Sequence, residues 1–116
     1  LDDSLSADLA RDGSLTPAAA RGEALFQGKA GCVGCHAGPR AGGTGARAWI
    51  GTTPEGRELD VPHLLGVHDS VPYLHDARAG SLEEVFGRWN QAKRHGAAHT
   101  LTETELGDLL RYLREL

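Results

Sequence analysis

The chain has 116 residues, a formal net charge of −4 at pH 7, two cysteines, no methionine, and only two each of Phe, Trp and Tyr. This length fits a single domain with a modest core, and the acidic balance argues against nucleic acid or an anionic membrane surface as a partner. No stretch approaches the roughly 20 apolar residues of a membrane-spanning helix. We therefore expect protein partners and no membrane insertion.

Residues 1–14 are polar, rich in aspartate and without hydrophobic periodicity, as is typical of a flexible leader or linker. The folded domain is expected over 15–116. It should begin with a helix over 17–26, because Thr16 offers an N-cap hydroxyl and a proline follows at the first helical position. Within this helix, Gly22 would allow another helix to approach closely.

Both cysteines belong to a Cys-x-x-Cys-His motif at 32–36. Two thiols at this spacing can each add to a vinyl group of haem, and the next imidazole can bind the iron. Cys32 and Cys35 are thus predicted to attach one haem c, with His36 as its proximal ligand. The alternatives are a redox dithiol, half of a zinc site, and a chance match. A redox dithiol would be expected to follow a buried strand, and no strand-like run precedes this motif. A structural zinc site would need four ligands, and the chain has no second cysteine pair to complete one.

Glycine and proline dominate residues 37–57, which predicts a loop with a brief extended piece at Trp49 and Ile50. Prolines then exclude a long helix over 59–76. Arginine and tryptophan side chains near the haem motif or near Tyr73 are candidates to contact the haem propionates, with a solvated surface position as the alternative. These candidates are Arg40, Arg47, Trp49 and Arg78.

Two helices are expected in the last third of the chain. Ser81 and Glu84 have the spacing of a capping box, and the helix that they begin should end between 90 and 93. Thr102 and Glu105 repeat this spacing before a stripe of leucines that continues to the last residue. The apolar face of the first helix is predicted to contain Leu82, Val85, Phe86 and Trp89; the stripe of the second is Leu106, Leu109, Leu110, Leu113 and Leu116.

Taken in order, these segments resemble the haem domains of the bacterial di-haem cytochrome c peroxidase and MauG superfamily. The resemblance covers residues 16–116. It rests on Arg21-Gly22 and Leu25-Phe26 before the haem motif, on 61–67, on Pro-Tyr-x-His-Asp at 72–76, on Ser-Leu-Glu-Glu-Val at 81–85, and on Leu101-Thr102 to Leu113.

The resemblance implies an all-α cytochrome c fold in which helices and long loops wrap around one covalently attached haem c. It also implies that the first and last helices cross beside the haem, and the candidates for that crossing are Gly22 and the region of Leu109, Tyr112 and Leu113. Members of the superfamily usually carry two such domains, whereas this chain has one haem motif.

The distal iron ligand cannot be methionine, because the chain has none. The position that resembles the superfamily's Met or Tyr ligand holds Trp89, and an indole is not a useful iron ligand. His95, in the connection between two helices, is the predicted distal ligand, and His99 in the same connection is its rival. Another side chain or an open site are the remaining alternatives.

Tyr73 and His75, both in the Pro-Tyr-x-His-Asp motif, are also predicted to contact the haem. The resemblance implies that His75 lies near the haem edge and forms a hydrogen bond rather than an iron bond. His75 and His68 are lesser candidates for the distal ligand, and the resemblance gives His63 no role.

The predicted function is single-electron transfer by a mono-haem c-type cytochrome domain, in exchange with redox partner proteins or a fused catalytic domain, and not catalysis by the domain itself. The alternative is a peroxidase-like or gas-binding module with an open or labile distal site. Because haem c is attached outside the cytoplasm and the chain begins at Leu1, we expect a periplasmic or extracellular bacterial protein that is either processed or cut from a longer one.

Overall fold

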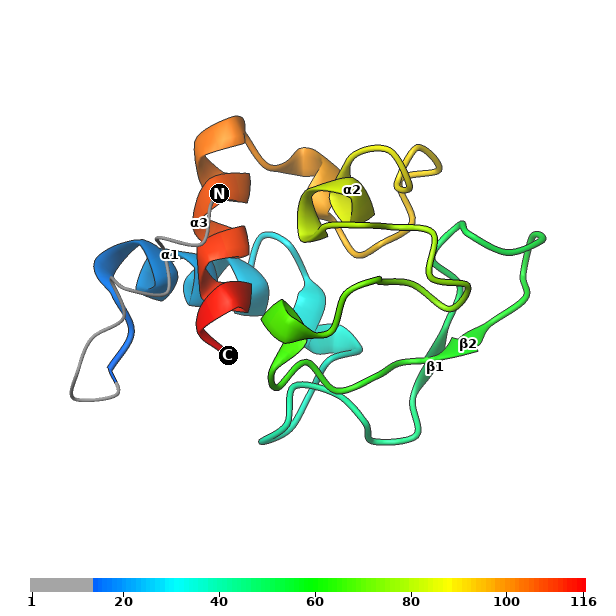
Figure 1. Cartoon of the computed structure of the whole chain (residues 1–116), viewed down its shortest axis with the longest axis horizontal. Helices are drawn as coiled ribbons and strands as arrows, with labels where there is room; N and C mark the ends of the chain where they lie inside the picture. Colours follow the sequence, from blue (N-terminus) through cyan, green and yellow to red (C-terminus); the bar gives the residue numbers. More distant parts are fainter. Residues whose placement is uncertain (1–13) are drawn as a thin grey trace.

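The computed structural model describes residues 14–116, so nearly all of the predicted leader lies outside the described residues. Figure 1 shows α1 and α3 side by side, with α2 and long irregular segments forming the rest of the molecule. The elements are α1 (Pro17–Gln27), η2 (Cys32–Gly34), β1 (Arg47–Ala48), β2 (Leu59–Asp60), η3 (Val67–Asp69), α2 (Leu82–Phe86), η4 (Ala98–Thr100) and α3 (Glu103–Glu115), where η marks a 3₁₀ turn.

The crossing of α1 and α3 depends on the absence of a side chain at Gly22. A Cβ atom there would lie 2.0 Å from the carbonyl oxygen of Asp108 and 2.8 Å from the Cβ of Tyr112. The start of α1 is also as expected, with the Thr16 hydroxyl accepting a hydrogen bond from the Ala19 amide. The predicted crossing of the first and last helices is therefore confirmed.

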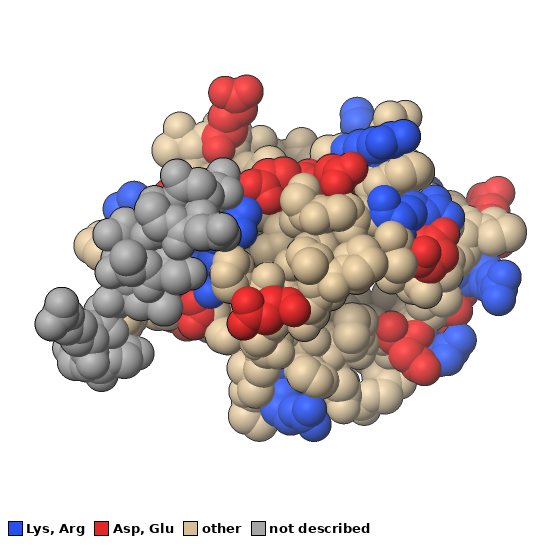
Figure 2. All heavy atoms as spheres, in the orientation of Figure 1, with Lys and Arg blue, Asp and Glu red and all other residues tan. Residues whose placement is uncertain are grey.

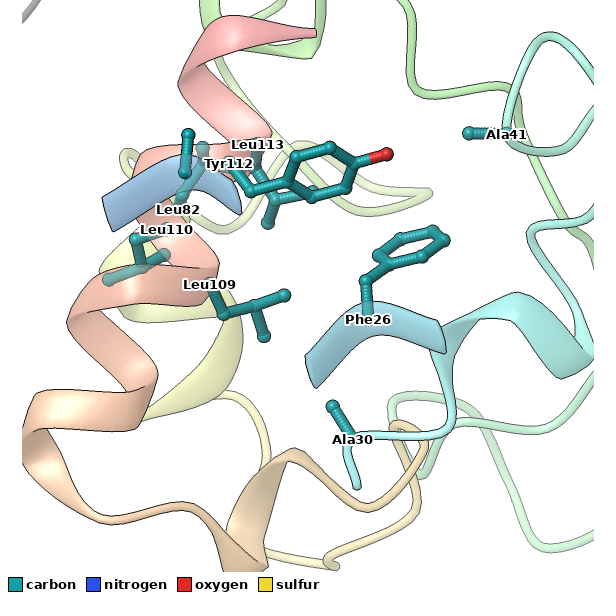
Figure 3. Packing of buried hydrophobic residues seen from close by; sticks show 9 residues of the cluster. Phe26, Ala30, Ala41, Leu82, Leu109, Leu110, Tyr112 and Leu113 are labelled. Carbon is teal, nitrogen blue, oxygen red and sulfur yellow. The ribbon is translucent and has the colours of Figure 1, made fainter. Parts of the chain in front are cut away.

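The hydrophobic core lies mainly between these two helices, as Figure 3 shows for Phe26, Leu109, Tyr112 and Leu113. The rings of Phe26 and Tyr112 meet edge to face, with their centroids 5.4 Å apart. This geometry is favourable for aromatic pairs beyond the apolar area that they bury. The core fixes α1 immediately before the haem motif and thereby positions the site.

Helix α3 begins with the expected capping box. The Thr102 hydroxyl accepts from the Glu105 amide at 3.1 Å, and the Glu105 carboxylate accepts from the Thr102 amide at 2.9 Å. Its last turn is tied to the start of α1, because the Glu115 carboxylate accepts hydrogen bonds from the amide and hydroxyl of Thr16. The two ends of the described domain are therefore joined.

Helix α2 is shorter than predicted, since it ends at Phe86 rather than between 90 and 93. Gly87 stands at its C-cap, and glycine is unfavourable in a helix interior by about 1 kcal/mol. The Ser81 hydroxyl caps the helix as expected, but the Glu84 carboxylate accepts from the amide of Gly80 instead of Ser81. As a result, Trp89 lies in the following turn and not on the helix.

The only paired strands in the described part of the chain form a two-residue antiparallel ladder, with Arg47 opposite Asp60. The expected extended piece therefore lies just before Trp49 and Ile50, and the fold is mostly helical rather than entirely so. Among residues 14–116, no helix has the length and hydrophobicity needed to cross a bilayer.

Candidate cofactor site

A cavity of about 560 Å³ lies between the α1–α3 pair and the irregular half of the molecule. This volume is in the range of about 300–1,000 Å³ that is usual for small-molecule and cofactor sites. Its walls are largely apolar and include Phe26 and Leu113 from the helix pair, Leu59 from β2, Ile50 just after β1, and Val85 and Phe86 from α2.

All three residues predicted to hold the cofactor line this cavity: Cys32, Cys35 and His36. The two cysteines are not joined in a disulfide, and burial raises the pKa of the Cys32 thiol to about 11. A redox dithiol needs an accessible thiolate, so this environment disfavours that alternative. Within residues 14–116, no three His, Cys, Asp or Glu side chains are grouped as a zinc site would require.

The ring of His36 is oriented through its Nδ1 atom, which lies 3.0 Å from the Pro62 carbonyl oxygen and 3.1 Å from that of Ala41. A neutral imidazole that donates from Nδ1 to a carbonyl leaves Nε2 free to bind a metal. Burial lowers the pKa of His36, which favours this neutral form.

Gly42 allows the carbonyl of Pro62 to reach His36. A Cβ atom at Gly42 would lie 2.2 Å from the Pro62 oxygen and 3.0 Å from the His36 Nδ1 atom. The glycine also has a φ of +123°, in a region that other residues rarely adopt. The glycine-rich loop after the motif thus has a definite role in orienting the imidazole.

His95 lines the same cavity as His36. Its ring packs against Phe86 with a centroid separation of 5.5 Å. Burial and, to a smaller extent, the nearby His36 lower the pKa of His95 to about 4. The side chain is therefore neutral at pH 7, as an iron ligand must be.

The segment that carries His95 is anchored to the chain just before the haem motif. The amide of Ala97 donates to the carbonyl of Ala30 at 2.7 Å, and the His95 amide donates to the Asn90 side chain at 3.2 Å. Gly96 allows this contact, because a Cβ there would lie 2.8 Å from the Ala30 oxygen. The structure thus fixes the histidine-bearing loop relative to the cysteines.

The other predicted site residues divide into two groups. Tyr73 and His75 line the cavity, and the Tyr73 hydroxyl donates to the carbonyl of His68. His99, Trp49 and Arg78 do not line the cavity. His99 is exposed in η4. The Trp49 indole donates to the Thr53 carbonyl, and Arg78 pairs with Asp76. Arg40 and Arg47 also lie outside.

Four polar residues of the lining had no predicted role at the site: Asp60, His63, Ser70 and Arg94. The Arg94 guanidinium lies over the ring of Trp49, 5.2 Å from its centroid. Its position directly before His95 could have suggested that Arg94 lies at the site, since the residue next to a predicted ligand is brought close to the same cavity. His63 follows Pro62, whose carbonyl is a partner of His36.

The described residues fit haem c. The cavity has a suitable volume and apolar walls, both cysteines face it, and His36 has one ring nitrogen held by backbone carbonyls. Cys32 and Cys35 would hold the cofactor, and His36 would bind its iron on one side. Of the other three histidines on the wall, His95 is half-buried, whereas His63 and His75 are exposed.

The comparisons with known proteins agree with this fit. Residues 19–116 match the cytochrome c family. The chain is 30% identical over 150 residues to hydrazine synthase subunit gamma of Kuenenia stuttgartiensis, covering 90% of this chain and 42% of that protein. It is 32% identical over 120 residues to the methylamine utilization protein MauG of Methylorubrum extorquens strain AM1, covering 84% and 34%.

A solved structure of Kuenenia stuttgartiensis hydrazine synthase, pressurized with xenon, is similar with a TM-score of 0.79 and 28% identity. The alignment covers 92% of this chain and 48% of that one, so the chain spans less than half the length of each of these relatives. The resemblance to the MauG superfamily and the cytochrome c fold are thereby confirmed. The chain belongs to the cytochrome c family.

Proposed function

We propose that this chain is a mono-haem c-type cytochrome domain that transfers single electrons within a larger or multi-component periplasmic redox system. Bound haem c supplies the Fe(III)/Fe(II) couple. Thioether bonds from Cys32 and Cys35 would hold it, and the imidazoles of His36 and His95 would be its axial ligands. The observation that carries the proposal is that both histidines line one cavity.

Electron transfer is favoured because each imidazole belongs to a segment that is fixed by backbone hydrogen bonds. His36 is oriented by the carbonyls of Ala41 and Pro62, and the His95 segment is joined to Ala30 through Ala97. Ligands that do not move allow the oxidation state to change with little rearrangement of the protein. Two histidine ligands also exclude water and leave no vacant position, whereas a peroxidase-like site needs one.

The partner of the domain is proposed to be a redox protein or a fused catalytic domain. The relatives support this, since the chain corresponds to 42% of hydrazine synthase subunit gamma and 34% of MauG. A periplasmic or extracellular site is proposed because haem c is attached outside the cytoplasm.

A potentiometric titration of the holoprotein, followed by visible absorption and repeated under carbon monoxide, tests the proposed function. We expect a reversible one-electron transition and a reduced spectrum that carbon monoxide leaves unchanged, because both axial positions are taken by protein. Rapid binding of carbon monoxide would contradict the proposal and favour the gas-binding or peroxidase-like alternative.

A further inference from the structure

A second, smaller pocket of about 310 Å³ lies outside the cofactor cavity. It is formed between the loop after Trp49 and the turn that follows α2. Its lining includes the basic residues Arg78 and Arg88 and the polar residues Thr52 and Gln91. Nothing in the proposed electron-transfer site uses these groups.

The charge at this pocket is positive although the whole chain is acidic. Arg78 pairs with Asp76, whereas Arg88 forms no ion pair with any residue of 14–116. Both guanidinium groups lie over the ring of Trp89, 5.0 Å and 4.8 Å from its centroid. Stacking on an indole holds a guanidinium in place while leaving its N–H donors available. Figure 2 shows basic side chains gathered over the segment that follows α2.

Two further polar atoms beside the pocket lack a partner among the described residues. They are Nε1 of Trp89 and the hydroxyl of Thr52, both buried. Buried donors are nearly always hydrogen-bonded in folded proteins. Because these two atoms have almost no accessible surface, an acceptor reaches them only if neighbouring side chains move. The exposed Arg88, which has no ion partner among residues 14–116, is open to a carboxylate directly.

The pocket lies beside the wall of the cofactor cavity. At Gly51, which lines the pocket, a Cβ atom would lie 2.6 Å from the Cβ of Ala92 and 3.4 Å from that of Arg94. Arg94 in turn lines the cofactor cavity and stacks on Trp49. A protein held at the pocket would therefore cover the surface beside the cavity.

We propose that this pocket receives an aspartate or glutamate side chain from an acidic surface of the redox partner protein. The inference rests on the proposed function, because it assumes that the domain exchanges electrons with another protein. Arginine and tryptophan are the residue types that most often dominate binding energy at protein interfaces. Complementary charge also speeds and orients association, which suits a transient electron-transfer complex.

The test is an NMR titration of the reduced, isotope-labelled holoprotein with a hexaglutamate peptide. It is done at low ionic strength, because charges are screened least there. We expect saturable shifts at the amides of 88–92 and at the Trp89 indole. Arg88→Gln should weaken the affinity about tenfold, as expected for loss of a charged hydrogen-bond partner.

The matched control is Arg40→Gln, which removes the same charge from an exposed arginine outside both the pocket and the cofactor cavity. It should bind the peptide like the unaltered protein. Equal weakening in both variants, or shifts that are not centred on 88–92, would overturn the proposal. Tighter binding of inorganic phosphate than of the peptide at the same residues would also overturn it, in favour of a small-anion site.

Visible spectra of the same samples separate this proposal from the proposed function. If Arg88→Gln keeps the spectrum of the unaltered protein, a loss of peptide binding is caused by the pocket and not by a changed cofactor site. If the unaltered protein is not six-coordinate yet binds the peptide as described, the proposed function fails and the docking pocket stands.

Discussion

Replacing His95 by alanine should convert a six-coordinate, low-spin cytochrome into one with a high-spin or water-bound iron. His95 lines the cavity with His36 and is less exposed than His63 and His75, the other histidines on the wall, and its partial burial keeps it neutral. Alanine leaves the distal position without a protein ligand. Visible absorption and electron paramagnetic resonance of the ferric protein measure the change, which should be complete and not partial.

The control for this substitution is His99→Ala. His99 lies four residues further along, is exposed in η4 and is not part of the cavity wall, so its loss should leave the spectra unchanged. An unchanged spectrum for His95→Ala together with a high-spin spectrum for His99→Ala would show that the loop supplies the other histidine.

Gly22→Ala should lower the free energy of unfolding by about 3 kcal/mol. The new Cβ would lie 2.0 Å from the carbonyl oxygen of Asp108, which is backbone and cannot turn aside. Relieving the clash requires α1 and α3 to separate, and that would loosen the packing of Phe26 against Tyr112. Denaturant unfolding of the holoprotein, extrapolated to water, measures the loss.

A matched substitution, Gly107→Ala, separates the clash from the general effect of adding a methyl group to a helix. Gly107 lies inside α3 with no atom within 4 Å of the position of a Cβ, so alanine there should stabilise by about 1 kcal/mol. If Gly22→Ala proved as stable as Gly107→Ala, the close crossing of the helices would be wrong.

The parts of the fold that were predictable from sequence are those set by neighbouring residues. The hydroxyls of Thr16 and Thr102 cap their own helices, and the leucine stripe of α3 repeats with the helical period. The end of α2 was predicted wrongly, although its signal is also local. The apolar pattern continues to Trp89, but Gly87 ends the helix earlier. The position of Trp89 depends on its contacts with Arg78 and Arg88, whose guanidinium groups stack on its ring.

The candidate site shows the same division. The haem motif is local, so its residues could be named at once, but the partners of His36 come from the loop at Ala41 and from Pro62, 26 residues away. Nearness to the motif in sequence made Trp49 a candidate to contact a haem propionate. In the structure Trp49 is not among the lining residues, whereas Arg94, which stacks on its ring, is. Which side of a loop faces a cavity is decided by tertiary packing.

The most direct test of two histidine ligands at the iron is the visible spectrum of the purified holoprotein, first ferric and then reduced with dithionite. The arrangement of His36 and His95 predicts sharp, split ferrous bands and no high-spin charge-transfer band in the ferric state. A ferric high-spin band would mean an open or water-bound iron and would contradict the proposed pair of ligands.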